Sequence, residues 1–272
     1  MLRIVNITGM WYNYNVMKRF TLVILAFFLV FTNMPVFSAQ AFVKKDLSVQ
    51  SSDKFNIKAS LTYPKVKGKK DFKTVVLLHS LGTDSMWWSD LPDTLLQDGY
   101  AVLAIDLRGH GKSVYDSKLN KVSWKNLTVN AYKKYPDDVL SVINYINQEY
   151  PKLHFFNDWA IIGSDIGGSA GIIASDRYKN NPKTIVLLSP VVHTRGLYIP
   201  VSVAQLDNVD FLSISCNTDF SAIEAQNYIK KFAQNGFTTY TSQSKGTGMI
   251  MIKNAPEVIP LIDEWIKQYL KD

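Results

Sequence analysis

Short apolar runs suited to strands buried in a parallel sheet recur along the chain and alternate with segments of helical periodicity. Thr74–Leu78 is a continuous apolar run rich in β-branched residues, the pattern of a central parallel strand. Further strands are predicted over 55–63 (as an edge strand), 100–105, 159–162, 184–188, 209–215 and 237–241, and helices over 85–97, 136–150, 222–234 and 256–270. This alternation predicts an α/β fold, with helices on both faces of a doubly wound, mostly parallel sheet.

Length and composition are compatible with one such domain. The chain has 272 residues, of which 47% are hydrophobic and 19% charged, as is ordinary for a folded globular protein. We expect a single domain over residues 42–272. The segment from Pro190 to Asp207, which follows the strand at 184–188, is too short to form a large cap domain.

The N-terminal 41 residues have the pattern of a secretory leader behind an over-extended start. Met17-Lys18-Arg19 begins a cationic segment, an apolar run over 21–31 follows, and small residues offer cleavage after Ser38 or Ala41. The apolar run is short for a transmembrane helix, although an uncleaved N-terminal anchor remains the alternative. We therefore expect an exported protein, periplasmic or extracellular, with membrane contact only through an uncleaved leader.

The charge is moderately basic and carries little information about function. Removing the leader's three basic residues lowers the net charge from +7 to +4. The lysine run at 65–70 is interpreted as a solvated hairpin turn, or alternatively as a surface for an acidic partner. Cys216 ends an apolar run, which predicts a small buried side chain. We expect no metal, since no cluster of His, Cys or carboxylate residues has ligand spacing. We also expect no cofactor and, since no nucleic-acid motif occurs, no nucleic-acid partner.

Three motifs follow predicted strands at the ends where such sheets place their sites. The first two are Leu-Leu-His-Ser-Leu-Gly at 77–82 and Asp-Leu-Arg-Gly-His-Gly-Lys-Ser at 106–113. The third is Gly-Ser-Asp-Ile-Gly-Gly-Ser-Ala-Gly at 163–171, a strand-to-helix turn dense in small residues. In this order the motifs resemble the α/β-hydrolase superfamily over about residues 54–272. The chain looks most like small bacterial ester or lactone hydrolases of the dienelactone-hydrolase and serine-aminopeptidase type.

In those relatives the turn reads Gly-x-Ser-x-Gly, and its serine is the nucleophile. Here the resemblance places Asp165 at that position, with the Ile166 and Leu81 amides as oxyanion donors. Gly167–Gly171 also matches Gly-x-Ser-x-Gly, but Ser169 lies one helical turn beyond the strand end. We interpret Ser169 as a packing residue and keep it open as an alternative nucleophile.

The resemblance implies that an acid and a base follow later strands. Asp219 follows the strand ending at Cys216 and is the candidate acid. Relatives carry a Gly-His-Gly-Thr turn after the last strand, whereas this chain reads Ser-Lys-Gly-Thr-Gly at 244–248, so Lys245 stands where histidine is expected. Among the four histidines, only His193 is a plausible substitute base; the others are His79, His110 and His154.

These residues predict a degenerate triad of Asp165, Asp219 and Lys245. The simplest expectation is that the Asp165 carboxylate and the Lys245 ammonium form an ion pair. Haloalkane dehalogenases and epoxide hydrolases use an aspartate nucleophile on this fold, but they need histidine-activated water. Two hypotheses follow: an exported, non-catalytic or much-weakened relative that binds a small molecule or an unknown protein partner, or an active hydrolase of esters or related small molecules that uses Asp165 or Ser169.

Overall fold

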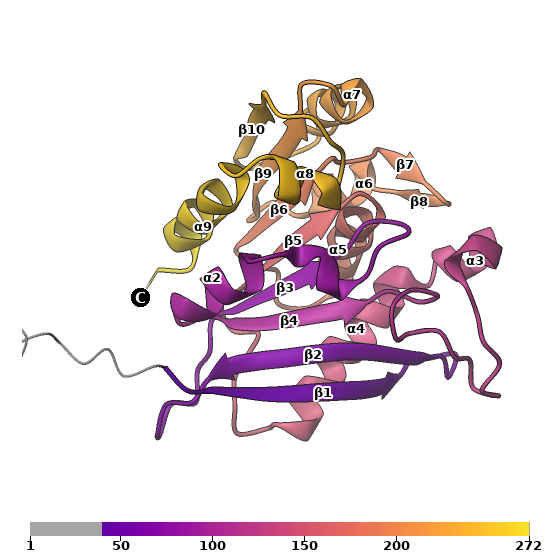
Figure 1. Cartoon of the computed structure of the whole chain (residues 1–272), viewed down its shortest axis with the longest axis vertical. Helices are drawn as coiled ribbons and strands as arrows, with labels where there is room; N and C mark the ends of the chain where they lie inside the picture. Colours follow the sequence, from indigo (N-terminus) through magenta and orange to yellow (C-terminus); the bar gives the residue numbers. More distant parts are fainter. Residues whose placement is uncertain (1–39, 272) are drawn as a thin grey trace, which may run out of the picture. The chain divides into compact units, whose positions relative to one another are not determined.

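The computed structural model describes residues 40–271, so the predicted leader lies almost entirely outside the described residues. An eight-stranded sheet has the order β1-β2-β4-β3-β5-β6-β9-β10 (Figure 1). β1 and β2 pair antiparallel, as do β2 and β4, and every later pair in the sheet is parallel. The strands are β1 (Phe42–Gln50), β2 (Asn56–Pro64), β3 (Thr74–Leu78), β4 (Ala101–Asp106), β5 (Trp159–Ser164), β6 (Thr184–Leu188), β9 (Asp210–Cys216) and β10 (Phe237–Ser242).

Helices cover both faces of this sheet, which confirms the predicted doubly wound α/β class. The helices are α2 (Leu91–Gln97), α3 (Val129–Tyr132), α4 (Tyr135–Glu149), α5 (Ile166–Arg177), α6 (Pro200–Gln205), α7 (Phe220–Ile229), α8 (Met249–Asn254) and α9 (Val258–Tyr269), with short 3-10 helices η1 (Ser85–Trp88) and η2 (Trp124–Asn126). Figure 1 shows α2, α8 and α9 on one side of the strands and α4 and α5 on the other.

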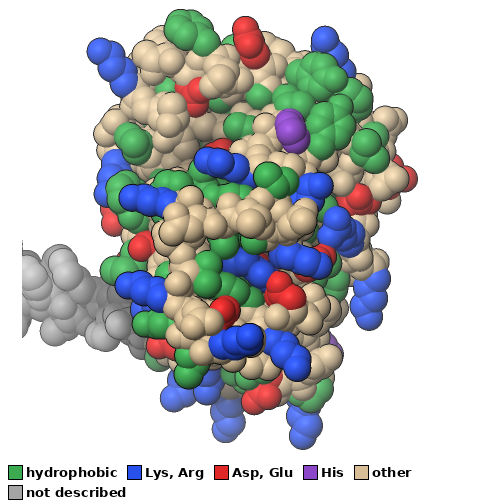
Figure 2. Space-filling model, turned by 90° about the vertical axis from the view of Figure 1, so that its right-hand side faces the viewer, with side chains coloured by type: hydrophobic (Ala, Val, Ile, Leu, Met, Phe, Trp, Pro, Cys, Tyr) green, Lys and Arg blue, Asp and Glu red, His purple; other side chains and the backbone are tan. Residues whose placement is uncertain are grey.

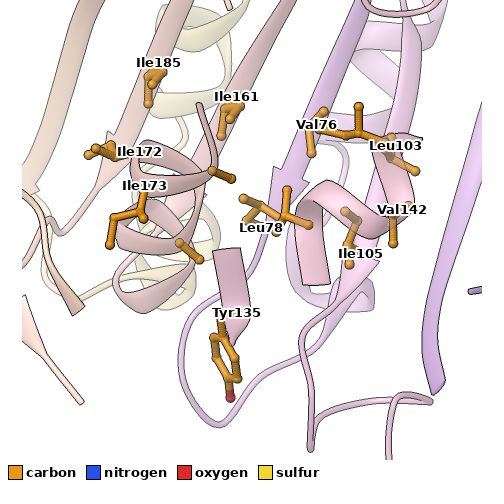
Figure 3. Packing of buried hydrophobic residues seen from close by; sticks show 14 of the residues in the cluster. Val76, Leu78, Leu103, Ile105, Tyr135, Val142, Ile161, Ile172, Ile173 and Ile185 are labelled. Carbon is orange, nitrogen blue, oxygen red and sulfur yellow. The ribbon is translucent and has the colours of Figure 1, made fainter. Parts of the chain in front are cut away.

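Two apolar clusters form the core because alternate residues of each strand point to opposite faces. In β3, Val76 and Leu78 join the cluster under α4 and α5, whereas Val75 and Leu77 join the cluster under α2 and α9. Figure 3 shows part of the first cluster, in which Val142 of α4 lies beside Leu103 and Ile105 of β4, and Ile172 of α5 lies on the side of Ile185 of β6. All five residues of β3 are buried, as a strand covered on both faces requires.

The edge of the sheet differs from the prediction. The strand predicted over 55–63 forms as β2, but it is not the edge strand, because β1 pairs along its whole length. β1 has only two fully buried side chains, Leu47 and Val49, and therefore lacks a clear apolar run. The lysines at 65–70 are exposed, but they do not form a hairpin turn, since β4 lies between β2 and β3.

The connection from β6 to β9 contains only short elements. A two-stranded hairpin, β7 (His193–Thr194) and β8 (Leu197–Tyr198), and the six-residue α6 occupy the segment between β6 and β9. The helix predicted over 85–97 divides into η1 and α2, because Ser89 adopts a positive φ of 53°. The Asp84 side chain caps η1 by accepting from the Met86 amide. Within residues 40–271 no helix combines the length and apolar character needed to cross a membrane.

Candidate functional site

Asp165 lies at the apex of the turn between β5 and α5. Its backbone has φ 51° and ψ −120°, a conformation that side-chain-bearing residues rarely adopt. Its N–H donates to the Leu188 carbonyl at 2.9 Å, which ties the turn to β6. Gly163 and Gly167 make the turn possible: a Cβ at Gly163 would lie 2.5 Å from the Gly168 Cα, and one at Gly167 would overlap the Leu78 carbonyl. The small residues of the third motif therefore permit close contact between strand and helix.

The Asp165 carboxylate lies at the amides that the resemblance identifies as oxyanion donors. The Leu81 N–H donates to Asp165 Oδ2 at 3.3 Å. Burial raises the pKa of Asp165 above its ordinary value, and hydrogen bonding from the Leu81 and Ile166 amides opposes that rise. The negative charge of Asp219 raises the pKa further, whereas the positive charge of Arg195 lowers it. The two carboxylates are thus electrostatically linked.

Asp219 follows β9, as predicted, and caps helix α7. Its Oδ1 accepts from the Ala222 amide at 3.2 Å and from the Ser221 hydroxyl at 2.9 Å. The residue is only 6% exposed, and Oδ2 accepts no hydrogen bond from the described part of the chain. Asp219 borders the cavity described below, and its Oδ2 has no protein donor within the described residues.

Lys245 does not lie beside either carboxylate. Its side chain is exposed, and within residues 40–271 it forms no ion pair. The predicted ion pair between Asp165 and Lys245 is therefore wrong. The loop after β10 presents Thr247 and Gly248 to the site instead, and the Gly248 N–H donates to the Ser189 hydroxyl at 2.7 Å. Loop direction, which the motif does not encode, decides which residue faces inward.

The histidines have structural or exposed positions. The His79 ring joins the Ser80 carbonyl to the Leu107 amide, and the His110 ring joins the Arg108 carbonyl to the Gly82 amide. Burial lowers the pKa of both rings to about 4, so both are neutral at pH 7. His193 is exposed on β7 and does not line the site. No histidine of the described chain is positioned as a base for Asp165.

The alternative serine lies inside α5. Ser169 is 2% exposed, and its hydroxyl forms no hydrogen bond within the described residues. It does not border the cavity beside Asp165, in agreement with its interpretation as a packing residue. Ser164 is also buried, with its hydroxyl 2.7 Å from that of Ser80.

A cavity of about 330 Å³ opens at the carboxyl ends of β3, β5, β6 and β9. Its polar lining consists of two carboxylates and several hydroxyls, and the remainder is mostly apolar. Its lining residues are Ser80, Leu81, Thr83, Asp165, Ser189, Pro190, Val191, Asp219, Ser221, Ala222, Thr247, Gly248, Met249 and Ile250. None of them is a lysine, arginine or histidine. In residues 40–271 no group of three or more His, Cys, Asp or Glu side chains is arranged to hold a metal ion.

Two larger depressions lie elsewhere. One of about 670 Å³ lies where β3, β4 and β5 begin, and in its lining Lys267 pairs with Asp98. The other, of about 1020 Å³, lies over β1 and β2 beside η1 and α2. Among these three cavities, all lined by described residues, only that of about 330 Å³ combines the strand carboxyl ends with the strained turn at Asp165.

Comparisons with known proteins agree with this architecture. The profile of the family described as "Serine aminopeptidase, S33" matches residues 69–212. A 2-hydroxy-6-oxononadienedioate/2-hydroxy-6-oxononatrienedioate hydrolase of Escherichia coli K12 is 26% identical over 132 residues, which are 47% of this chain and 40% of that enzyme. The chain thus spans about two fifths of the length of that curated relative.

Solved structures share the fold at low sequence identity. A Pyrococcus furiosus esterase has a TM-score of 0.62 at 19% identity, covering 84% of this chain and 92% of its own. Anabaena variabilis dienelactone hydrolase has a TM-score of 0.64 at 16% identity, covering 85% and 99%. An acetyl xylan esterase from Paenibacillus sp. R4 has a TM-score of 0.67 at 13% identity, covering 88% and 86%. At these identities the likeness establishes the fold and leaves the chemistry to the site.

Proposed function

This chain belongs to the serine aminopeptidase family of α/β-hydrolases, and from that premise we propose that its cavity binds a small molecule without hydrolysing it. In this proposal Asp165, Asp219 and Lys245 occupy the triad-equivalent positions along the chain. Asp165 replaces the serine nucleophile, and Lys245 replaces the histidine base.

The hydrogen bond from the Leu81 amide to Asp165 Oδ2 carries the proposal. Acyl transfer needs amide donors that are free to stabilise the negative oxygen of the tetrahedral intermediate. A carboxylate already held at Leu81 occupies one donor, and its charge opposes a second negative oxygen nearby. Loss of one oxyanion donor alone typically reduces kcat by about 10²–10³.

The lining also lacks a general base suited to activating a hydroxyl or water. Lys245 is exposed, and no histidine borders the cavity. General base catalysis typically contributes about 10²–10⁴ in rate, so its loss adds to that of the oxyanion donor. Both deficits support a binding protein derived from a hydrolase fold.

The strained turn favours a second candidate, an active hydrolase with Asp165 as nucleophile. A non-glycine residue at φ 51° and ψ −120° stores on the order of 1–3 kcal/mol, which is typical of positions retained for function. Attack by the Asp165 carboxylate on an epoxide carbon would break the bond from that carbon to the ring oxygen, which takes up a proton from water, and would give an ester that activated water must then hydrolyse. Without a base at the cavity, this candidate predicts a trapped covalent ester.

The test compares wild-type protein with Asp165→Ala on p-nitrophenyl acetate and butyrate. We expect both to match the rate without protein, as does Asp207→Ala, a control at an exposed aspartate outside the cavity. An ester-hydrolysis rate at least tenfold above that of Asp165→Ala would reject the binding-only proposal. Intact-mass measurement after incubation with a small epoxide tests the second candidate, which requires a covalent adduct absent from Asp165→Ala.

We also propose that the protein is exported. The cationic segment, apolar run and small residues over 17–41 support a leader, with an uncleaved anchor as the alternative. Export is independent of the proposed binding function.

A further inference from the structure

The cavity beside Asp165 contains negative charge that its own lining does not neutralise. Asp165 and Asp219 both border it, and no cationic side chain does. Basic side chains are spread over the outer surface of the face toward which the β7–β8 hairpin projects (Figure 2). We propose that this cavity binds a small primary ammonium compound with an apolar body; this inference rests on the proposed binding function and names its ligand class.

Asp219 supplies the first anchoring oxygen. Its Oδ1 is engaged by Ser221 and Ala222, whereas Oδ2 lacks a donor within residues 40–271 although the residue is 94% buried. Since Asp219 borders the cavity, this oxygen is available to accept a hydrogen bond from a bound molecule, and a bond between two charged groups is about twice as strong as a neutral one. An ammonium group offers three N–H donors and a compensating charge.

Asp165 supplies the second anchor. One of its oxygens accepts from Leu81, and the residue is half-buried at the base of the cavity. Burial and the Asp219 charge both make its ionised form less favourable. A cation between the two carboxylates would offset both penalties by its attraction to each of them.

No basic side chain of the described residues borders the cavity, so none competes with a bound ammonium group there. Lys245 is exposed and unpaired within the described chain, and Arg195, whose charge reaches Asp165, is exposed and outside the lining. Its guanidinium lies over the Tyr132 ring, 5.4 Å from the ring centroid. Arg195 thus acts on Asp165 from outside the cavity, and no lining side chain of the cavity balances its two carboxylates.

The remaining lining selects an apolar body of limited size. Six apolar residues border the cavity: Leu81, Pro190, Val191, Ala222, Met249 and Ile250. Its volume of about 330 Å³ is at the lower end of the range for small-molecule pockets, roughly 300–1,000 Å³. A one-ring amine fits this volume and chemistry, and a carboxylate of the same shape meets electrostatic repulsion.

Isothermal titration calorimetry with three isosteric probes tests the inference, in phosphate buffer at pH 7.5 so that the buffer contains no amine. We expect benzylamine to bind at least tenfold more tightly than benzyl alcohol, and benzoate to show no binding. Asp219→Asn and Asp165→Asn should each weaken benzylamine binding at least fivefold. Asn at 219 retains an oxygen that can cap α7, so this variant should fold, and Asp207→Asn is the control for charge alone.

Benzylamine binding no tighter than benzyl alcohol would overturn the inference, as would wild-type affinity in both asparagine variants. These results are distinguishable from failure of the proposed function. Ester turnover that depends on Asp165 rejects the binding-only function whatever the amine selectivity. Absence of both turnover and amine selectivity rejects this ligand class alone.

Discussion

The Leu81 amide donates to the Asp165 carboxylate at 3.3 Å across the strand ends of β3 and β5. In a working acyl-transfer site, a donor at this place serves the substrate. Here the Leu81 amide donates to the protein's own Asp165 carboxylate. The negative charge beside this donor therefore belongs to the protein, whereas in an acyl-transfer site it would develop on the substrate. This exchange underlies both the loss of hydrolysis and the cation selectivity proposed above.

The stability of the protein should depend on pH through Asp165. Its pKa in the folded state lies above the ordinary 3.8, so the folded protein retains a proton that the unfolded chain has released. The contribution of this group to stability is full below 3.8 and is lost as the pH rises through the folded pKa. Urea unfolding from pH 4 to 8 should therefore show Asp165→Asn gaining stability relative to wild type as the pH rises. A constant difference would contradict the raised pKa.

Replacing Arg108 should destabilise the fold strongly. Its guanidinium donates to Asp138 at 2.7 and 2.9 Å and to Asp53 at 2.6 and 2.7 Å, with side-chain exposures of 6% for Arg108 and 1% for Asp138. Arg108→Met leaves the buried Asp138 carboxylate unpaired, which typically costs about 3–5 kcal/mol. Urea unfolding measures this loss.

The matched control for Arg108 is Arg177→Met, which removes an exposed pair with Asp137. Such a pair contributes at most about 1 kcal/mol, so the control should remain close to wild type. Equal losses in the two variants would show that burial does not determine the cost.

Gly163→Ala should disrupt the turn that presents Asp165. The added Cβ would lie 2.5 Å from the Gly168 Cα, so backbone on both sides must shift. We expect a loss of at least about 2 kcal/mol, within the range for overpacking a tight interior. Gly68→Ala is the control, because φ is 80° there but nothing lies within 4 Å, and it should lose only about 1 kcal/mol. Thermal unfolding that ranks Gly68→Ala as the more damaging change would refute this account.

Introducing serine at 165 together with histidine at 245 or at 247 should show which of these two loop positions after β10 can place a base at the cavity. Thr247 borders the cavity, whereas the Lys245 side chain is exposed outside it. In an Asp165→Ser background, which frees the Leu81 amide, Thr247→His should therefore accelerate labelling by a fluorophosphonate probe more than Lys245→His does. We expect the labelling rates of the two variants to differ at least tenfold, because a positioned general base typically contributes about 10²–10⁴ in rate. A faster Lys245→His variant would show that this loop turns inward.

Export predicts a defined mature N-terminus. Expression of the full chain in a bacterial host, followed by fractionation and intact-mass measurement, should give a protein that begins at residue 39 or 42 outside the cytoplasm. A membrane-bound product of full length would instead support the uncleaved anchor.

Most of the sheet could be predicted from the sequence because its central strands are buried on both faces. Thr74–Leu78 and Thr184–Leu188 form strands with the predicted bounds, since continuous apolar runs of this length have no other favourable environment in such a fold. The sequence does not reveal β1, because most of its residues are exposed and polar. Nor does it reveal α8, which follows a glycine-containing loop and is only six residues long.

The site divides in the same way. Glycines at 163 and 167 are local requirements of a turn too tight for a Cβ, so the sequence alone determined where the strained position falls and that a carboxylate occupies it. The partners of that carboxylate depend on how distant loops are directed. The resemblance to family motifs predicts Lys245 beside Asp165. Only the tertiary structure decides that Thr247 and Gly248 border the cavity while the lysine side chain is exposed to solvent. An ammonium group in solvent keeps the hydration that it would lose on burial.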